Sequence, residues 1–125
     1  VRSVPFYEGE ISGGVQRLVG GEPRCHLDIP LMEECDLAFR SSDEAMSPEI
    51  MVGTIVFLKK MGVNAIIPGG LYVIVCANYV ILRRVRLEPK GLLRLETVNP
   101  TYDNMTISAD QVQEVYRVVG NLKLY

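Results

Sequence analysis

Short apolar runs separated by glycine, proline and polar residues recur along this chain at intervals of about ten residues, which is typical of compact β-rich domains. The strongest run, Leu71–Cys76, follows a glycine pair and is rich in β-branched residues. A second run, Tyr79–Val85, begins after only two intervening residues, Ala77 and Asn78. Two such runs joined by a two-residue connection predict a β-hairpin.

Other stretches have the same strand-like character. They are Val4–Tyr7, Asp36–Arg40, Thr54–Leu58, Leu92–Thr97 and Val115–Val119. Lys59–Asn64 is expected to be a connector. Only Ser42–Ile50 indicates a helical turn, because Ser42 or Asp43 can cap it and Glu44 lies in its first turn. The pattern therefore predicts a mainly β fold of twisted sheets with one short helical turn at Ala45.

Composition and charge narrow the classes of function. The 125 residues suit one domain, and 48% of them are hydrophobic, enough for a real core. The formal net charge of -2 argues against a domain that grips DNA by itself, because neutralising phosphates supplies much of DNA-binding affinity. If the whole protein binds DNA, we expect another segment to do so.

Metal, cofactor and membrane roles find no support in the residues. The three cysteines include no CxxC pair, so we expect no disulfide framework or zinc site but reduced, mostly buried thiols, as in a cytoplasmic protein. The acidic residues Glu33, Glu34 and Asp36 are interpreted as a solvated turn rather than a metal site. No apolar run approaches the roughly 20 residues of a membrane-spanning helix. We expect no cofactor.

Three segments, in this order and spacing, resemble the C-terminal domains of LexA-type and phage CI-type repressors. They are Asp43–Val56, Gly69–Val85 and Leu95–Gly120. The family reads Gly-Asp-Ser-Met-x-Pro-x-Ile in the first, Gly-x-x-Tyr and Val-x-Val-Lys-Arg-Leu in the second, and Leu-x-Ser-x-Asn-x-x-Tyr in the third. The matching motif residues are Met46, Pro48, Gly53, Tyr72, Arg84, Asn99 and Tyr102. The resemblance covers nearly the whole chain and implies the β-rich LexA/signal-peptidase-like fold.

The resemblance also implies a reaction, cleavage of the protein's own hinge by a Ser–Lys dyad. The nucleophile position falls on Ala45, the base position on Arg83, and the cleaved pair on Gly13 and Gly14, where many members have Ala-Gly. Alanine has no nucleophilic atom, and arginine keeps its proton at any ordinary pH. We therefore predict that self-cleavage has been lost. Arg83 is expected to face the former catalytic cleft and to pair with Asp43 or Glu44.

The resemblance further implies a regulatory role. Residues 1–24 are interpreted as a hinge or cleavage-like segment, and residues 25–125 as a regulatory and dimerisation domain. An upstream helix-turn-helix domain, absent from this chain, would bind operator DNA, and homodimers would match its two half-sites. We expect the dimer to form by strand-mediated pairing through the last strand, Val115–Val119. An anti-repressor protein or a recombinase filament is a further expected partner.

Two alternatives stay open at this point. Ala45 could be an engineered replacement of the serine in an active autopeptidase, although Arg83 argues against it. Alternatively, the vacated cleft could bind a peptide or anti-repressor, with Arg83 anchoring a carboxylate. Among other candidates, Ser47 is interpreted as a surface residue and Ser42 as a cap, and His26 has no evident catalytic partners.

Overall fold

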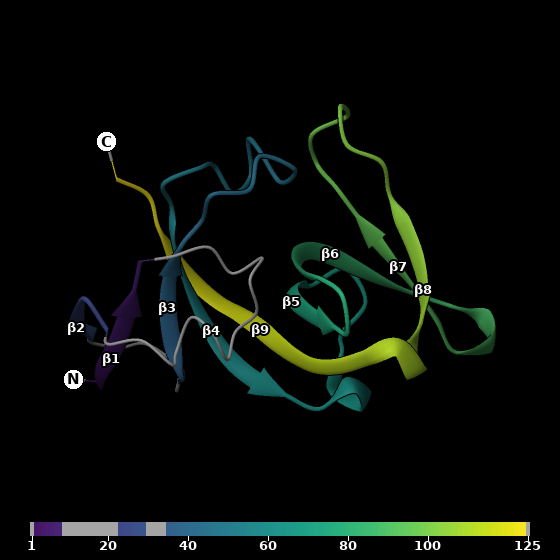
Figure 1. Ribbon diagram of the computed structural model, residues 1–125, viewed down its shortest axis with the longest axis horizontal. Coiled ribbons are helices and arrows are strands. Elements are labelled where there is room, and N and C mark those ends of the chain that lie inside the picture. Colours follow the sequence, from purple (N-terminus) through teal and green to yellow (C-terminus); the bar gives the residue numbers. More distant parts are fainter. Residues whose placement is uncertain (1, 9–22, 30–34, 125) are drawn as a thin grey trace.

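The computed structural model describes residues 2–8, 23–29 and 35–124, which form one mixed nine-stranded sheet (Figure 1). The strands are β1 (Arg2–Tyr7), β2 (Cys25–Ile29), β3 (Leu37–Arg40), β4 (Ile55–Met61), β5 (Leu71–Cys76), β6 (Val80–Glu88), β7 (Leu92–Glu96), β8 (Met105–Ser108) and β9 (Val112–Leu122). Their order across the sheet is β2-β1-β3-β4-β9-β5-β6-β7-β8. The predicted mainly β fold is confirmed.

Helical structure in the described residues is limited to three 3-10 turns. They are η2 (Val63–Ala65), η3 (Pro89–Gly91) and η4 (Ala109–Gln111). No helix in this part of the chain has the length and apolar character that crossing a membrane requires.

The last strand, β9, occupies the middle of the sheet. It is antiparallel to β4 on one edge, from Ile55 opposite Leu122 to Met61 opposite Val115, and to β5 on the other edge. Figure 1 shows β9, in yellow, running between the β3–β4 end of the molecule and the β7–β8 end. The long central strand therefore joins the two halves of the sheet.

This placement corrects the expected dimer contact. Residues Val115–Arg117 have β4 on one edge and β5 on the other, so their backbone groups are already paired within the chain. Pairing with β5 ends at Arg117, opposite Tyr72, whereas pairing with β4 continues to Leu122. Strand-mediated pairing with a second copy through Val115–Val119 is thus wrong for its first three residues, because they belong to a central strand and not to an edge.

Several predicted strands are confirmed with altered ends. The predicted hairpin is formed by β5 and β6, and the Cys76 N–H donates to the Tyr79 carbonyl at 2.9 Å beside its turn. Strand β4 continues through Lys59 and Lys60, which we expected in a connector, because β9 offers a partner as far as Met61. Strand β2 was not predicted.

Three clusters of buried residues follow the sheet. One lies under β1, β3 and β4, and a second under the β5–β8 half. The third lies between them and combines residues of β3, β4, β5, β6 and β9 with Met46 and Ile50. Of the three cysteines, Cys35 and Cys76 are buried as expected, whereas Cys25 is exposed on β2. The central cluster connects the sheet to the loop before β4, where the candidate site lies.

Truncating the central cluster should destabilise the domain. Leu58 is fully buried on β4, so Leu58→Ala is expected to lower the free energy of unfolding by about 2–5 kcal/mol through lost burial and a residual cavity. Leu124, 54% exposed, provides a matched control, and Leu124→Ala should change stability by less than about 0.5 kcal/mol. Urea unfolding followed by circular dichroism measures both. Equal effects of the two truncations would contradict the assigned core.

Candidate functional site

Ala45 lies in a hydrogen-bonded turn and not in a helix. The Ala45 N–H donates to Asp43 Oδ1 at 2.8 Å, the Ser47 N–H to the Glu44 carbonyl at 3.1 Å, and the Ile50 N–H to the Met46 carbonyl at 2.9 Å. Pro48 has no N–H and cannot continue a helical bonding pattern. The expected helical turn at Ala45 is therefore one irregular turn, and the capping side chain is Asp43 instead of Ser42.

The turn is anchored in the core by its own apolar side chains. Ala45 and Met46 are fully buried, and Ile50 is nearly so. Met46 and Ile50 belong to the central cluster and pack with residues of β3, β4, β5 and β6. Gly53 then returns the chain towards β4 with a φ of 94°, a conformation that favours glycine. Burial of Met46 and Ile50 in the central cluster thus holds Ala45 in a fixed position relative to the sheet.

Arg83 reaches the same turn from strand β6. It lies opposite Tyr72 in the β5–β6 register, and its residue surface is only 9% exposed. Its Nη1 donates to Asp43 Oδ2 at 2.8 Å and to the Leu82 carbonyl at 2.7 Å. The expected pairing of Arg83 with a carboxylate of this segment is confirmed, and the carboxylate is that of Asp43.

One carboxylate therefore connects the two positions that the sequence resemblance singles out. Oδ1 of Asp43 accepts the backbone N–H of Ala45, and Oδ2 accepts the guanidinium of Arg83. This arrangement disfavours the alternative in which Arg83 anchors the carboxylate of a partner, because its guanidinium is already bound within the chain. Asp43 was one of two sequence candidates for each role, as a cap of the turn and as the partner of Arg83, and the structure assigns both roles to it.

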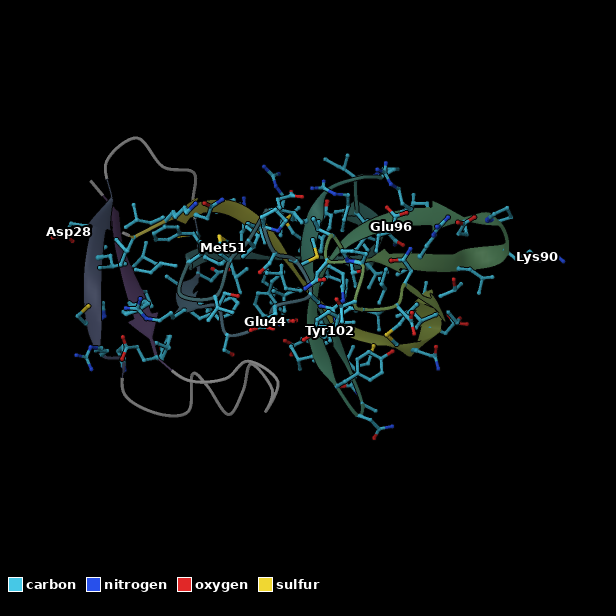
Figure 2. The ribbon with its side chains drawn as sticks, turned by 90° about the horizontal axis from the view of Figure 1, so that it is seen from above. Asp28, Glu44, Met51, Lys90, Glu96 and Tyr102 are labelled. Atoms are coloured by element: carbon cyan, nitrogen blue, oxygen red, sulfur yellow. The ribbon has the colours of Figure 1, made fainter. Side chains whose placement is uncertain are left out.

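The segment after β7 holds the turn from another side. The Val98 and Asn99 N–H groups donate to the Ala45 carbonyl at 3.0 and 2.9 Å, and Asn99 Nδ2 donates to the Glu44 carbonyl at 3.2 Å. The Tyr102 N–H donates to the Asn99 carbonyl at 3.1 Å. Figure 2 shows Glu44 and Tyr102 at this junction. Sequence reasoning had singled out Asn99 but not these backbone contacts, which depend on donors that every residue except proline carries.

The remaining motif residues have structural contacts. Tyr72 is 1% exposed, and its hydroxyl accepts the Ile67 N–H at 2.8 Å. Arg84, on the opposite face of β6 from Arg83, forms an ion pair with Glu49 and donates to the Gly69 carbonyl. Arg83 and Arg84 thus hold the two ends of the same turn, through Asp43 and Glu49.

The other sequence candidates are not brought to Ala45. His26 is exposed on β2, Ser42 is exposed, and Ser47 is partly exposed. Asp36 accepts the Lys60 N–H at 2.7 Å. Within the described residues no group of three His, Cys, Asp or Glu side chains is arranged to hold a metal. Gly13, Gly14, Glu33 and Glu34 lie outside the described residues.

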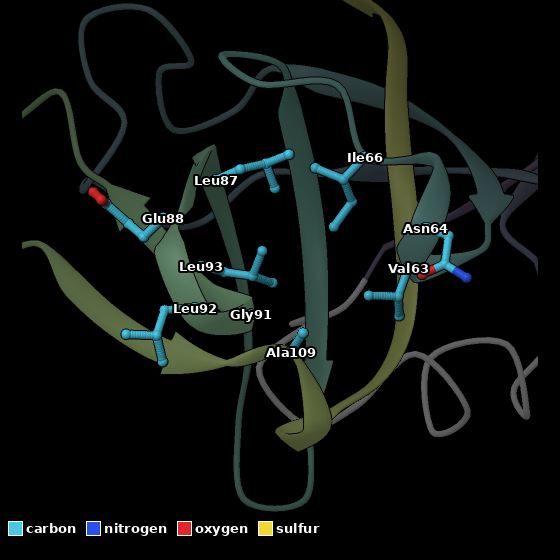
Figure 3. Close-up of a pocket in the computed structure, with 9 residues that line it drawn as sticks. All are labelled: Val63, Asn64, Ile66, Leu87, Glu88, Gly91, Leu92, Leu93 and Ala109. Atoms are coloured by element: carbon cyan, nitrogen blue, oxygen red, sulfur yellow. The ribbon is translucent and has the colours of Figure 1, made fainter.

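A separate apolar groove lies at the far end of the β6–β7 hairpin (Figure 3). Its volume is about 300 Å³. The lining residues are Val63, Asn64, Ile66, Leu87, Glu88, Gly91, Leu92, Leu93 and Ala109. In Figure 3 the carboxylate of Glu88 points away from the other labelled side chains, so no charged side chain among the described lining residues is directed into the groove.

Comparison with known proteins gives one family for the chain. Residues 5–122 match the family model described as Peptidase S24-like, which covers almost the entire sequence and includes Ala45 and Arg83. No curated protein matches the chain significantly.

Removing the bridging carboxylate should destabilise the fold. Asp43→Ala leaves the mostly buried Arg83 without its ion-pair partner, so we expect a loss of about 1–3 kcal/mol in the free energy of unfolding. Glu44→Ala removes the neighbouring, exposed carboxylate and should cost less than about 0.5 kcal/mol. Urea titrations of the two variants provide the comparison, and similar losses in both would argue against the assigned role of Asp43.

Proposed function

This chain belongs to the Peptidase S24-like family, and on that premise we propose that it is a regulatory and dimerisation domain that no longer cleaves itself. Domains of this family are typical of the C-terminal halves of LexA and phage repressors. The observation that carries the proposal is the Asp43–Arg83 ion pair, 2.8 Å long, beside a fully buried Ala45.

The chemistry of the two positions supports the loss of self-cleavage. Acyl transfer by a Ser–Lys dyad needs a hydroxyl that attacks and an amine that is neutral when it accepts the proton. Ala45 supplies a methyl group. Arg83 carries a guanidinium, a group that keeps its proton at any ordinary pH, and that proton-bearing group is bound to Asp43. Neither half of the reaction has a group to perform it.

The surface near the C-terminus supports a homodimer. The edge of β9 that faces away from β4 is unpaired with β5 beyond Arg117. Four exposed apolar residues occur at the end of this strand and in the loop that precedes β4. They are Met51, Val52, Leu122 and Leu124. A strand edge that has no strand partner among the described residues, with exposed apolar side chains nearby, suits pairing with a second copy.

The net charge supports a scheme in which one domain of the full protein binds DNA and this domain forms the dimer. A domain with a formal net charge of -2 has little electrostatic attraction for phosphates. In the proposed scheme an upstream helix-turn-helix domain binds operator DNA, and this domain joins two such heads. Without self-cleavage, the regulator would respond to a protein such as an anti-repressor rather than to scission of its own hinge.

The full-length protein should remain intact under conditions that favour self-cleavage. We expect no specific scission near Gly13 and Gly14 during alkaline incubation or with an activated recombinase filament, as measured by intact-protein mass spectrometry. Ala45→Ser alone should also stay intact, because Arg83 cannot act as the base. Cleavage of the unaltered protein would contradict the proposal. Cleavage of the single variant Ala45→Ser would show that the protein lacks only the nucleophile and still has a working base.

The pH of this incubation has an upper limit set by two tyrosines, the partly buried Tyr79 and the buried Tyr116. Burial and the neighbouring Cys76 thiol raise the pKa of Tyr79 to about 12. Burial and the hydrogen bond to Glu114 raise the pKa of Tyr116 well above its ordinary value. A tyrosine whose pKa is raised on folding stabilises the fold fully below its ordinary pKa of 10.0 and loses that contribution as the pH rises through the folded pKa. The incubation should therefore stay below pH 10.0.

The dimer can be tested through the exposed end of β9. Sedimentation equilibrium at tens of micromolar should show a dimer. Leu122→Glu, at a residue 44% exposed, should weaken it by about tenfold or more, the equivalent of about 1.4 kcal/mol. Leu92→Glu, at a residue 37% exposed on β7, is the matched control and should leave the association unchanged. A monomeric unaltered protein, or equal effects of the two variants, would count against this interface.

A further inference from the structure

We propose that Asp43 is the positioning residue that keeps the Ala45 turn closed to acyl transfer, so that restoring a serine and a lysine at positions 45 and 83 does not by itself restore a working dyad. This inference rests on the proposed function and names the side chain that controls the same site.

The two oxygens of Asp43 bind the groups that a nucleophile and a base would need. Oδ1 lies 2.8 Å from the backbone nitrogen of residue 45, and Oδ2 lies 2.8 Å from Nη1 of residue 83. The Arg83 side chain is 11% exposed and that of Asp43 34%, so water screens the pair only in part. Both contacts are short and involve a charged acceptor, which makes them strong hydrogen bonds.

The hydrogen bond between Asp43 and the N–H of residue 45 affects how the site would stabilise the carbonyl oxygen of the peptide bond to be cleaved. During acyl transfer this oxygen gains negative charge and needs N–H donors directed at it. The N–H of the nucleophilic residue itself is a donor close to the reacting carbon. Here that N–H is directed at the carboxylate of Asp43, which is negative itself and would repel an oxyanion. A serine at position 45 would therefore meet an unfavourable electrostatic environment.

The contact at residue 83 concerns the base. A lysine is a base only when burial or a neighbouring cation lowers its pKa towards neutrality, whereas a carboxylate beside it stabilises the ammonium form. A lysine at position 83 would lie next to Asp43 and would be held in its protonated form. The carboxylate that forms an ion pair with Arg83 would thus prevent a lysine at this position from acting as a base.

Other charged groups near position 83 are engaged elsewhere. Within β6, Arg84 pairs with Glu49, and on β7 Glu96 pairs with Arg86 and Arg94. On β5 the residue opposite Arg83 is the neutral Tyr72, and beyond it Arg117 of β9 is in register. Glu44 is exposed, and no other carboxylate in the described chain lies within ion-pair distance of Arg83. Asp43 is therefore the group expected to set the pKa of a lysine there.

The experiment compares three variants that all carry Ala45→Ser and Arg83→Lys. One retains Asp43, one adds Asp43→Asn, and one adds Glu44→Gln as the matched control. Each is treated with a fluorophosphonate probe, and labelling is followed by mass spectrometry. In the labelling step the serine oxygen forms a bond to phosphorus, the phosphorus–fluorine bond breaks to release fluoride, and the hydroxyl proton passes to the lysine amine.

The pKa of the lysine introduced at position 83 is measured in the same three proteins by NMR of isotopically labelled lysine. The native lysines serve as internal references, and they are Lys59, Lys60, Lys90 and Lys123.

We expect Asp43→Asn to lower the pKa of the introduced lysine by about 1–3 units and to raise the labelling rate by about tenfold or more, since each unit changes the neutral fraction about tenfold. Glu44→Gln should change both quantities far less.

If the Asp43→Asn variant does not fold, Asp43→Ser removes the charge while keeping an oxygen that can cap the N–H of residue 45. Equal pKa values and labelling rates with and without the Asp43 carboxylate would overturn the inference. Self-cleavage of the unaltered protein would instead overturn the proposed function, so the two failures are distinguishable.

Discussion

The pairing of β9 with β4 on one edge and with β5 on the other is the constraint on which the rest of this structure depends. Because β9 is central, the loop that precedes β4 and the hairpin formed by β5 and β6 are held on the same sheet. The turn that carries Ala45 comes from that loop, and Arg83 comes from that hairpin. Residues far apart in sequence therefore meet through the Asp43 carboxylate, whose bond to Arg83 spans 40 residues.

Burial of a guanidinium explains why the site takes this form. A charged group removed from water is costly unless it is paired and hydrogen-bonded. Arg83 satisfies this requirement through Asp43 and the Leu82 carbonyl. The same carboxylate caps the Ala45 turn, and the Val98 and Asn99 N–H groups bind the Ala45 carbonyl. A permanent cation at position 83 and a carboxylate at position 43 thus form a stable structural unit around Ala45.

The sequence predicted the local features of this structure better than its long-range pairing. The β5–β6 hairpin was predicted, because two-residue turns and β-branched runs are visible locally. The pairing of Arg83 with Asp43 or Glu44, which spans 40 residues, was predicted only because the family resemblance places Arg83 at the same cleft as this turn. Strand β2 was missed, since His26 and Asp28 interrupt its apolar character. The central place of β9 could not be predicted, because strand composition does not reveal how many neighbours a strand has. The backbone donors of Val98 and Asn99 leave no signal in side-chain chemistry.

The coupling between Asp43 and Arg83 is the central claim, and a double-mutant cycle with Asp43→Ala and Arg83→Met measures it most directly. The account predicts that the combined variant is more stable than the sum of the two single losses by about 1–3 kcal/mol, because each substitution alone strands the charge of its partner. Losses in the free energy of unfolding that simply add would contradict it.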